Sequence, residues 1–140
     1  NQVKVLIKNR IPVLGHLGLL PQSNKGKFKS KGKTTREIKK LFSDALLLQK
    51  AGVFAIVLEC VKTPIAKQIT KDLNIPTIGI GSSVHCDGQV LVTDDLLGLN
   101  ETKIRFVKKY LNIKKYINLG LKKYASDVKS KKYPSKKHSY

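Results

Sequence analysis

The chain has 140 residues, of which 41% are apolar, which is enough for one ordinary domain with a hydrophobic core. Its formal net charge is +19, from 25 lysines and three arginines against nine acidic residues. No apolar run approaches the ~18 residues that a membrane-spanning helix needs. The two cysteines, Cys60 and Cys86, lack the spacing of a metal site. These features favour a cytoplasmic protein with reduced thiols and no membrane partner.

The high net charge permits two interpretations. Clustered cations gain affinity for nucleic acids by releasing counterions from phosphates, which would make the chain a basic nucleic-acid-binding module. Phosphate and base recognition favours arginine, however, and the chain has only Arg10, Arg36 and Arg105. Lysine recurs on nearly every predicted helix, which favours solvated helix surfaces over a specific nucleic-acid partner.

The apolar pattern predicts a succession of strands and helices. Residues 3–10 resemble the last turns of a helix, and residues 11–18 form a short predicted strand that opens close to a proline. A loop over residues 19–33, rich in Gly, Ser, Asn and Lys, has the length of a binding loop or lid. The remaining predicted elements are a helix over 34–51, a strand over 53–59, a helix over 63–73, strands over 75–81 and 90–93, and a helix in two pieces between 103 and 128.

Two of these helices carry boundary signals. Thr34 and Glu37 have the spacing of a capping box, and Gly52 suits a left-handed turn that ends the helix. The next helix is predicted to use Thr63 as its N-cap and Pro64 in its first turn.

The order of elements predicts an α/β fold with a parallel sheet. Strands that alternate with amphipathic helices form right-handed crossovers. Residues 11–18 and 75–81 also resemble one another, as repeated units of one architecture do. Four such units make half of an eight-stranded barrel. We therefore expect residues 1–128 to form a barrel half and residues 129–140 to form a basic C-terminal tail.

Glu59 ends the most apolar stretch of the chain. The run from Ala51 to Leu58 has no polar alternation, which is typical of a strand buried on both faces. A carboxylate at the carboxyl end of such a strand is partly desolvated and is suited to general-base chemistry. The alternative is a structural ion pair between Glu59 and a neighbouring lysine at the strand end.

A set of short motifs resembles the ketopantoate hydroxymethyltransferase family in order and spacing. The motif GHLGLLPQS at residues 15–23 opens the resemblance, and VLECV at residues 57–61 contains Glu59. Together the motifs cover essentially the whole chain. The others are at residues 31–33, 43–46, 51–52, 75–81, 87–92, 95–98, 106–110, 133–134 and 138–139.

The resemblance implies a fold, a reaction and partners. Family members are (β/α)8 TIM barrels that assemble into homo-oligomers, and this chain resembles the last four β/α units. The implied reaction is the transfer of a hydroxymethyl group from 5,10-methylenetetrahydrofolate to 3-methyl-2-oxobutanoate in pantothenate biosynthesis. A magnesium ion chelates the keto acid and makes the proton beside its carbonyl more acidic. The resemblance places the magnesium ligands in the N-terminal barrel half, and none in this chain.

The resemblance also implies two site residues. Glu59 matches the family's catalytic base, in agreement with the argument from its position at the strand end. His16 matches the histidine that contacts the keto acid. The alternative for His16 is a structural histidine that bonds to backbone carbonyls.

Other motifs are interpreted as structural. Gly79 and Gly81 lack the third glycine of a dinucleotide-binding loop. His85 and Cys86 have no second ligand pair for zinc. Asp94 and Asp95 are expected to be turn and helix-cap residues. Two stretches depart from the family pattern: the loop over 24–33 is shorter and more basic, which puts folate contacts in question, and residues 82–83 are both serine.

Three hypotheses about function remain. The first is a hydroxymethyltransferase half that is inactive without the N-terminal half. The second is a non-catalytic truncated barrel remnant with exposed sheet edges and apolar surface. The third, supported by charge alone, is the basic nucleic-acid-binding module.

Overall fold

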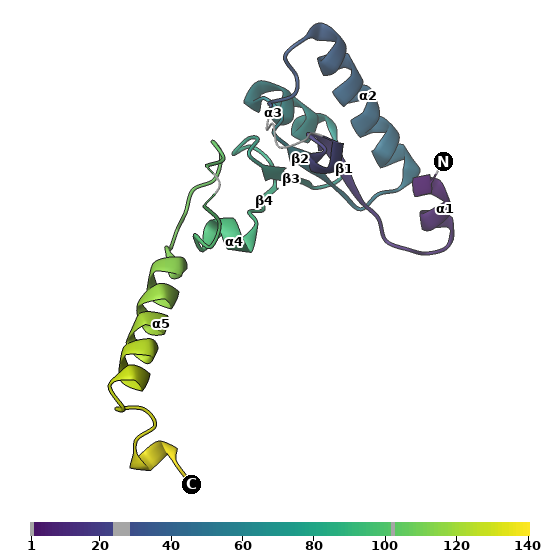
Figure 1. Ribbon diagram of the computed structural model, residues 1–140. Coiled ribbons are helices and arrows are strands. Elements are labelled where there is room, and N and C mark those ends of the chain that lie inside the picture. Colours follow the sequence, from purple (N-terminus) through teal and green to yellow (C-terminus); the bar gives the residue numbers. More distant parts are fainter. Residues whose placement is uncertain (1, 24–28, 102) are drawn as a thin grey trace. The chain divides into compact units, whose positions relative to one another are not determined.

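The computed structural model describes residues 2–23, 29–101 and 103–140. It forms two compact units, Asn1–Leu91 and Val92–Tyr140, which we describe separately (Figure 1). Part of the predicted basic loop, residues 24–28, lies outside the described residues. No helix in the described ranges is long and apolar enough to cross a membrane.

The first unit is built on a parallel sheet. Its strands are β1 (Leu14–Gly18), β2 (Ala55–Glu59), β3 (Thr77–Ile80) and β4 (Gly88–Gln89), and they lie in this sequential order. Each neighbouring pair is parallel. This confirms the predicted parallel α/β sheet, and sequential order is the strand order of a β/α barrel.

Three helices accompany the sheet: α1 (Gln2–Lys8), α2 (Thr35–Ala51) and α3 (Thr63–Asp72). The predicted boundaries of α2 are confirmed. The Thr34 hydroxyl accepts a hydrogen bond from the Glu37 N–H at 3.2 Å, and Gly52 ends the helix with φ 94°. The N-cap prediction for α3 is wrong. Thr63 is already its first helical residue, and the Thr63 hydroxyl donates to the Ser82 carbonyl instead.

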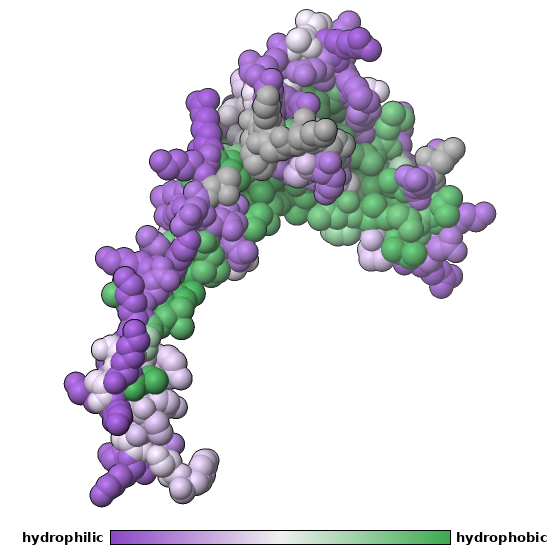
Figure 2. Space-filling view, viewed as in Figure 1, coloured by the Kyte–Doolittle hydropathy of each residue, from purple (hydrophilic) through white to green (hydrophobic). Residues whose placement is uncertain are grey.

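The two faces of the sheet have different surroundings. Side chains alternate between faces along a strand, and Ile56 and Leu58 point to the face covered by α2 and α3, where both are 0% exposed. They pack there with Leu41, Ala45, Ala66 and Ile69. On the opposite face Leu14 is 44% exposed. Figure 2 shows apolar residues gathered on the side of this unit away from α2.

The fourth predicted strand is wrong in its position. The structure places β4 at Gly88–Gln89, two residues before the predicted start at Val90. The Val90 N–H still donates to the Gly79 carbonyl at 3.0 Å, but Val90 and Val92 are about half exposed. In the described ranges, the run 90–92 therefore pairs with the sheet only through this bond, and its exposed valines lack the apolar cover of a strand.

The second unit contains α4 (Thr93–Leu96), α5 (Ile113–Lys129) and the short 3-10 turn Lys136–His138. The predicted helical piece that begins at Lys103 is absent from the described residues 103–112. In its place, the Tyr110 N–H bonds to the Leu96 carbonyl at 2.9 Å, which holds the segment against α4. Asn112 then starts α5 by accepting a hydrogen bond from the Lys115 N–H. Local capping thus begins the helix ten residues later than apolar spacing predicts.

The predicted C-terminal tail is attached to α5 by ring contacts. The Tyr133 ring lies 5.6 Å from the Tyr124 ring and 5.5 Å from the His138 ring, measured between centroids. The His138 Nδ1 is 2.8 Å from the Ser135 hydroxyl, which also accepts from the Lys137 N–H at the start of the 3-10 turn.

Candidate functional site

The two site residues predicted from the sequence are in contact. Gly18 of β1 is aligned with Glu59 of β2, so His16, two residues earlier on β1, points from the same face as Glu59. The His16 Nε2 lies 3.1 Å from the Glu59 Oε2. Strand register therefore joins residues that are 43 positions apart in the chain.

Glu59 is the more enclosed member of the pair. Its side chain is 10% exposed and that of His16 is 32% exposed. A carboxylate removed from water needs a hydrogen-bond donor. With a proton on Nε2, His16 supplies this donor and holds the carboxylate in place. Among the described residues, Glu59 and His16 contact each other, whereas the alternatives from sequence pair Glu59 with a lysine and His16 with backbone carbonyls.

The position of the pair suits proton transfer. Both residues lie toward the carboxyl ends of parallel strands, where active sites of β/α barrels occur. The carboxylate can accept a proton from a carbon acid within hydrogen-bond reach. Among the described residues the His16 ring bonds to Glu59 through Nε2, so its Nδ1 can contact a polar group of a ligand.

A cavity of about 370 Å³ opens beside His16. Its other polar lining residues form local contacts: Lys40 pairs with Asp44 at 2.9 Å, and Glu37 accepts from the Lys33 N–H. That hydrogen bond is the main cause of the lowered pKa of Glu37, and the Lys31 charge adds to it. The remaining lining residues are Leu17, Gly18, Leu20, Lys31 and Leu41.

Cys60, next to Glu59, is a buried thiol. Burial raises its pKa, and the negative charge of Glu59 raises it further. A thiol with a raised pKa contains less of the reactive thiolate. Cys60 is therefore expected to react slowly despite its position next to the site.

Comparison with known proteins identifies the family. The family model described as ketopantoate hydroxymethyltransferase matches residues 1–136. The chain belongs to the ketopantoate hydroxymethyltransferase family. Among curated relatives, the 3-methyl-2-oxobutanoate hydroxymethyltransferase of Pelagibacter ubique (strain HTCC1062) is 62% identical over 138 residues, which is 99% of this chain and 53% of that protein.

Two archaeal relatives carry the same name. The proteins of Saccharolobus islandicus (strain L.S.2.15) and Saccharolobus solfataricus are 49% and 48% identical over 138 residues. Each alignment covers 97% of this chain and 52% of the relative. This chain thus spans about half the length of these curated relatives. The four-stranded parallel sheet agrees with the C-terminal half of a TIM-barrel family.

Asp94 and Asp95 lie in the first turn of α4. Their expected helix-cap role is wrong, because Val92 is the N-cap and no side chain caps the helix there. Asp95 is buried and accepts a hydrogen bond from the Asn100 amide at 2.9 Å. In the described ranges, no three or more His, Cys, Asp or Glu side chains form a group that could hold a metal ion.

Gly79 within β3 and the two serines after the strand have defined contacts. A Cβ on Gly79 would lie 2.8 Å from the Gln89 side chain, which supports its interpretation as a packing glycine. The two serines that depart from the family pattern both form hydrogen bonds with other residues of the first unit. The Ser82 hydroxyl donates to the Val61 carbonyl, and the Ser83 carbonyl accepts from Gln89.

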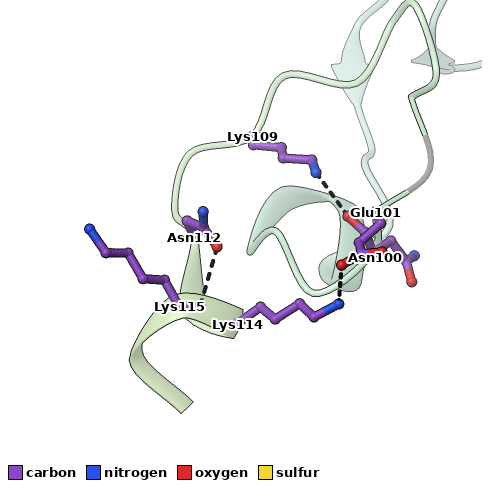
Figure 3. A network of polar contacts seen from close by, with 6 residues as sticks. All are labelled: Asn100, Glu101, Lys109, Asn112, Lys114 and Lys115. Carbon is purple, nitrogen blue, oxygen red and sulfur yellow. Dashed lines mark hydrogen bonds and ion pairs between the residues drawn. The ribbon is translucent and has the colours of Figure 1, made fainter. Parts of the chain in front are cut away.

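A separate polar network lies in the second unit (Figure 3). The Lys109 ammonium donates to the Asn100 carbonyl at 2.8 Å, and Lys114 pairs with Glu101. With the Asn112 cap these contacts connect the start of α5 to the segment after α4. They line a cavity of about 410 Å³ and have a structural role.

Sequence reasoning missed two features near the pair. The close approach of Gly18 to β2 was not identified, although a glycine directly after an apolar strand is a signal for such contacts. The second is Lys31, whose backbone pairs with Val61 beside the end of β2. This contact between distant segments leaves no local pattern in the sequence.

Proposed function

We propose that this chain supplies the proton acceptor, Glu59, for hydroxymethyl transfer from 5,10-methylenetetrahydrofolate to 3-methyl-2-oxobutanoate, giving 2-dehydropantoate. The observation that carries the proposal is the enclosed Glu59 carboxylate in contact with His16 at the carboxyl end of the sheet. Family membership supports the reaction class.

Glu59 acts in the first chemical step. Its carboxylate takes the proton from the carbon beside the keto group, and the electrons of the broken C–H bond form the enolate. The enolate carbon then forms a C–C bond to the one-carbon unit, and one water supplies the hydroxyl oxygen. Both C–N bonds of that unit break, and tetrahydrofolate leaves with two protons on its nitrogens, one from the keto acid through Glu59 and one from the water. His16 holds the carboxylate and contacts the keto acid, which keeps the proton acceptor next to the reacting carbon.

A magnesium ion bound to the keto acid would stabilise the enolate oxygen. The described residues of this chain do not form a metal-binding group. We therefore assign the metal ligands to the half of the relatives that this chain does not span. The roles proposed for Glu59 and His16 do not include metal binding.

The uncovered face of the sheet supports a need for that other half. Leu14 is 44% exposed there, and Val57, Ile78 and Ile80 are only half-buried. Closing a barrel with four further β/α units would cover this face and remove both sheet edges. Assembly into a homo-oligomer, as the resemblance implies, is part of the same proposal.

The test combines this chain with the N-terminal half of the Pelagibacter relative, by co-expression or fusion, with magnesium and both substrates. Formation of 2-dehydropantoate is expected from the combined protein and not from either half. Glu59→Gln should reduce turnover by about 100-fold or more, because a positioned base contributes 10²–10⁴-fold.

The matched control is Glu101→Gln, which changes an exposed glutamate of the second unit and leaves Glu59 and the cavity beside His16 intact. Full turnover of the Glu59→Gln protein would remove Glu59 from the mechanism. If the combined protein folds as one unit and is inactive with glutamate as well as with glutamine at position 59, the result would favour the hypothesis of a non-catalytic barrel remnant.

A further inference from the structure

The backbone at the end of β2 is fixed from both sides. The carbonyl of Glu59 accepts a hydrogen bond from the Leu19 N–H at 2.9 Å, and the N–H of Cys60 donates to the Ile80 carbonyl at 2.9 Å. Both groups belong to the peptide that joins Glu59 to Cys60. Its plane is thus held between β1 and β3, and that plane sets the direction of the Glu59 side chain.

Cys60 has an unusual backbone conformation at this point. Its φ is +53°, in the left-handed region that residues other than glycine seldom adopt. The Cys60 carbonyl also accepts a hydrogen bond from the Lys31 N–H at 2.8 Å. Strained backbone of this kind persists only where surrounding contacts hold it, and it occurs often at functional sites.

Gly18 provides the space for this arrangement. A Cβ built on Gly18 would lie 2.1 Å from the Glu59 carbonyl oxygen, and the φ of Gly18 is +101°. The close approach lets the next residue, Leu19, donate to that same oxygen. Any side chain at position 18 would push β1 and the end of β2 apart.

We propose that Gly18 and Cys60 are positioning residues for the reaction, acting through the backbone to keep the Glu59 carboxylate against His16. Residue 60 acts through its left-handed conformation and not through its thiol. The role in catalysis depends on the proposed function, whereas the role in positioning does not.

A series of substitutions at position 60 separates backbone from thiol. Glycine adopts the left-handed conformation freely, alanine adopts it at a cost similar to that of cysteine, and valine is strongly disfavoured there. The matched control is Cys86→Val, because Cys86 is 7% exposed against 6% for Cys60 and lacks a positive φ. For Gly18→Ala the control is Gly88→Ala, because a Cβ on Gly88 would lie 3.9 Å from its nearest neighbour, the Ile78 Cγ1.

The first measurement is the NMR spectrum of the His16 imidazole in the 140-residue chain, with Glu59→Ala as the reference for a broken contact. Cys60→Val and Gly18→Ala should shift the ring signals toward this reference. Cys60→Gly, Cys60→Ala and both controls should keep the wild-type signals. A wild-type spectrum from a folded Cys60→Val chain would overturn the proposal, even if Gly18→Ala does not fold.

The second measurement is turnover by the combined protein. Cys60→Val should lower kcat by about 100-fold, the effect of misplacing a base, with the KM for the keto acid nearly unchanged. Cys60→Ala should retain activity. Equal losses in Cys60→Ala and Cys60→Val would assign the effect to the thiol and overturn the backbone role. If Glu59→Gln itself retains activity, the proposed function fails while the NMR result still decides positioning.

Discussion

The His16 Nε2 and the Glu59 Oε2 lie 3.1 Å apart on adjacent parallel strands. The contact places an imidazole that is 32% exposed next to a carboxylate that is 10% exposed. It connects the two proposed roles, substrate contact by His16 and proton acceptance by Glu59, because His16 also holds the Glu59 carboxylate.

Replacing His16 by alanine should weaken substrate binding in the combined protein. A hydrogen bond to a charged group contributes about 1.5–3 kcal/mol, so the KM for the keto acid should rise by about 10–100-fold. His85→Ala, which removes an exposed histidine from the loop after β3, is the control and should leave KM unchanged. An unchanged KM in His16→Ala would argue against a substrate contact.

The Thr34 cap should contribute measurably to the stability of the chain. Thr34→Ala removes the acceptor of the Glu37 N–H, and loss of such a cap costs about 0.5–2 kcal/mol. Urea denaturation should show this decrease in the free energy of unfolding. Thr35→Ala, one residue further into α2 and also exposed, should change it by much less.

The covered and uncovered faces of the sheet should respond differently to truncation. Ile56→Ala creates a cavity at a fully buried site, and such changes cost about 2–5 kcal/mol. Ile78→Ala, on the half-buried opposite face, should cost less in the 140-residue chain. Denaturation of the two variants measures the difference, and equal losses would show that the second face is also packed.

Asp87 should make stability sensitive to acid. Its carboxylate accepts from the Thr77 N–H at 2.7 Å and the Thr77 hydroxyl at 3.0 Å. The hydrogen bond from the Thr77 N–H is the main cause of the lowered pKa of Asp87. The stabilisation is therefore present above the ordinary aspartate pKa of about 3.9 and is lost as pH falls through the lower value of the folded protein.

The variant Asp87→Asn should lose this acid-dependent part of the stability. Between neutral pH and about pH 3, the free energy of unfolding of Asp87→Asn, measured by denaturation, should therefore depend less steeply on pH than that of the wild type. Asp72→Asn, an exposed aspartate on α3, is the comparison. A wild-type pH dependence in Asp87→Asn would assign the effect to other carboxylates.

Local signals predicted part of the fold well. The ends of α2 follow from Thr34 and Gly52, since capping depends on residues adjacent in the chain. The prediction failed where nonlocal contacts compete, as at residues 103–112, whose backbone bonds to Leu96. It failed again at Val90, where the strand needs a sheet neighbour that apolar pattern alone does not reveal.

The candidate site was predicted to a different extent for each residue. The position of Glu59 followed from the end of an apolar run, and His16 followed only from the family resemblance. Their contact depends on the register of β1 against β2, which one sequence does not specify. The strained backbone at Cys60 was not predicted, because a left-handed cysteine has no sequence signal.

The most direct test of Glu59 as proton acceptor is hydrogen exchange at the carbon beside the keto group of 3-methyl-2-oxobutanoate. The combined protein in deuterated water, without folate, isolates proton removal from the later transfer. The account predicts that Glu59→Gln slows deuterium incorporation by about 100-fold or more, while Glu101→Gln leaves it unchanged. Deuterium incorporation at the wild-type rate in Glu59→Gln would contradict the account.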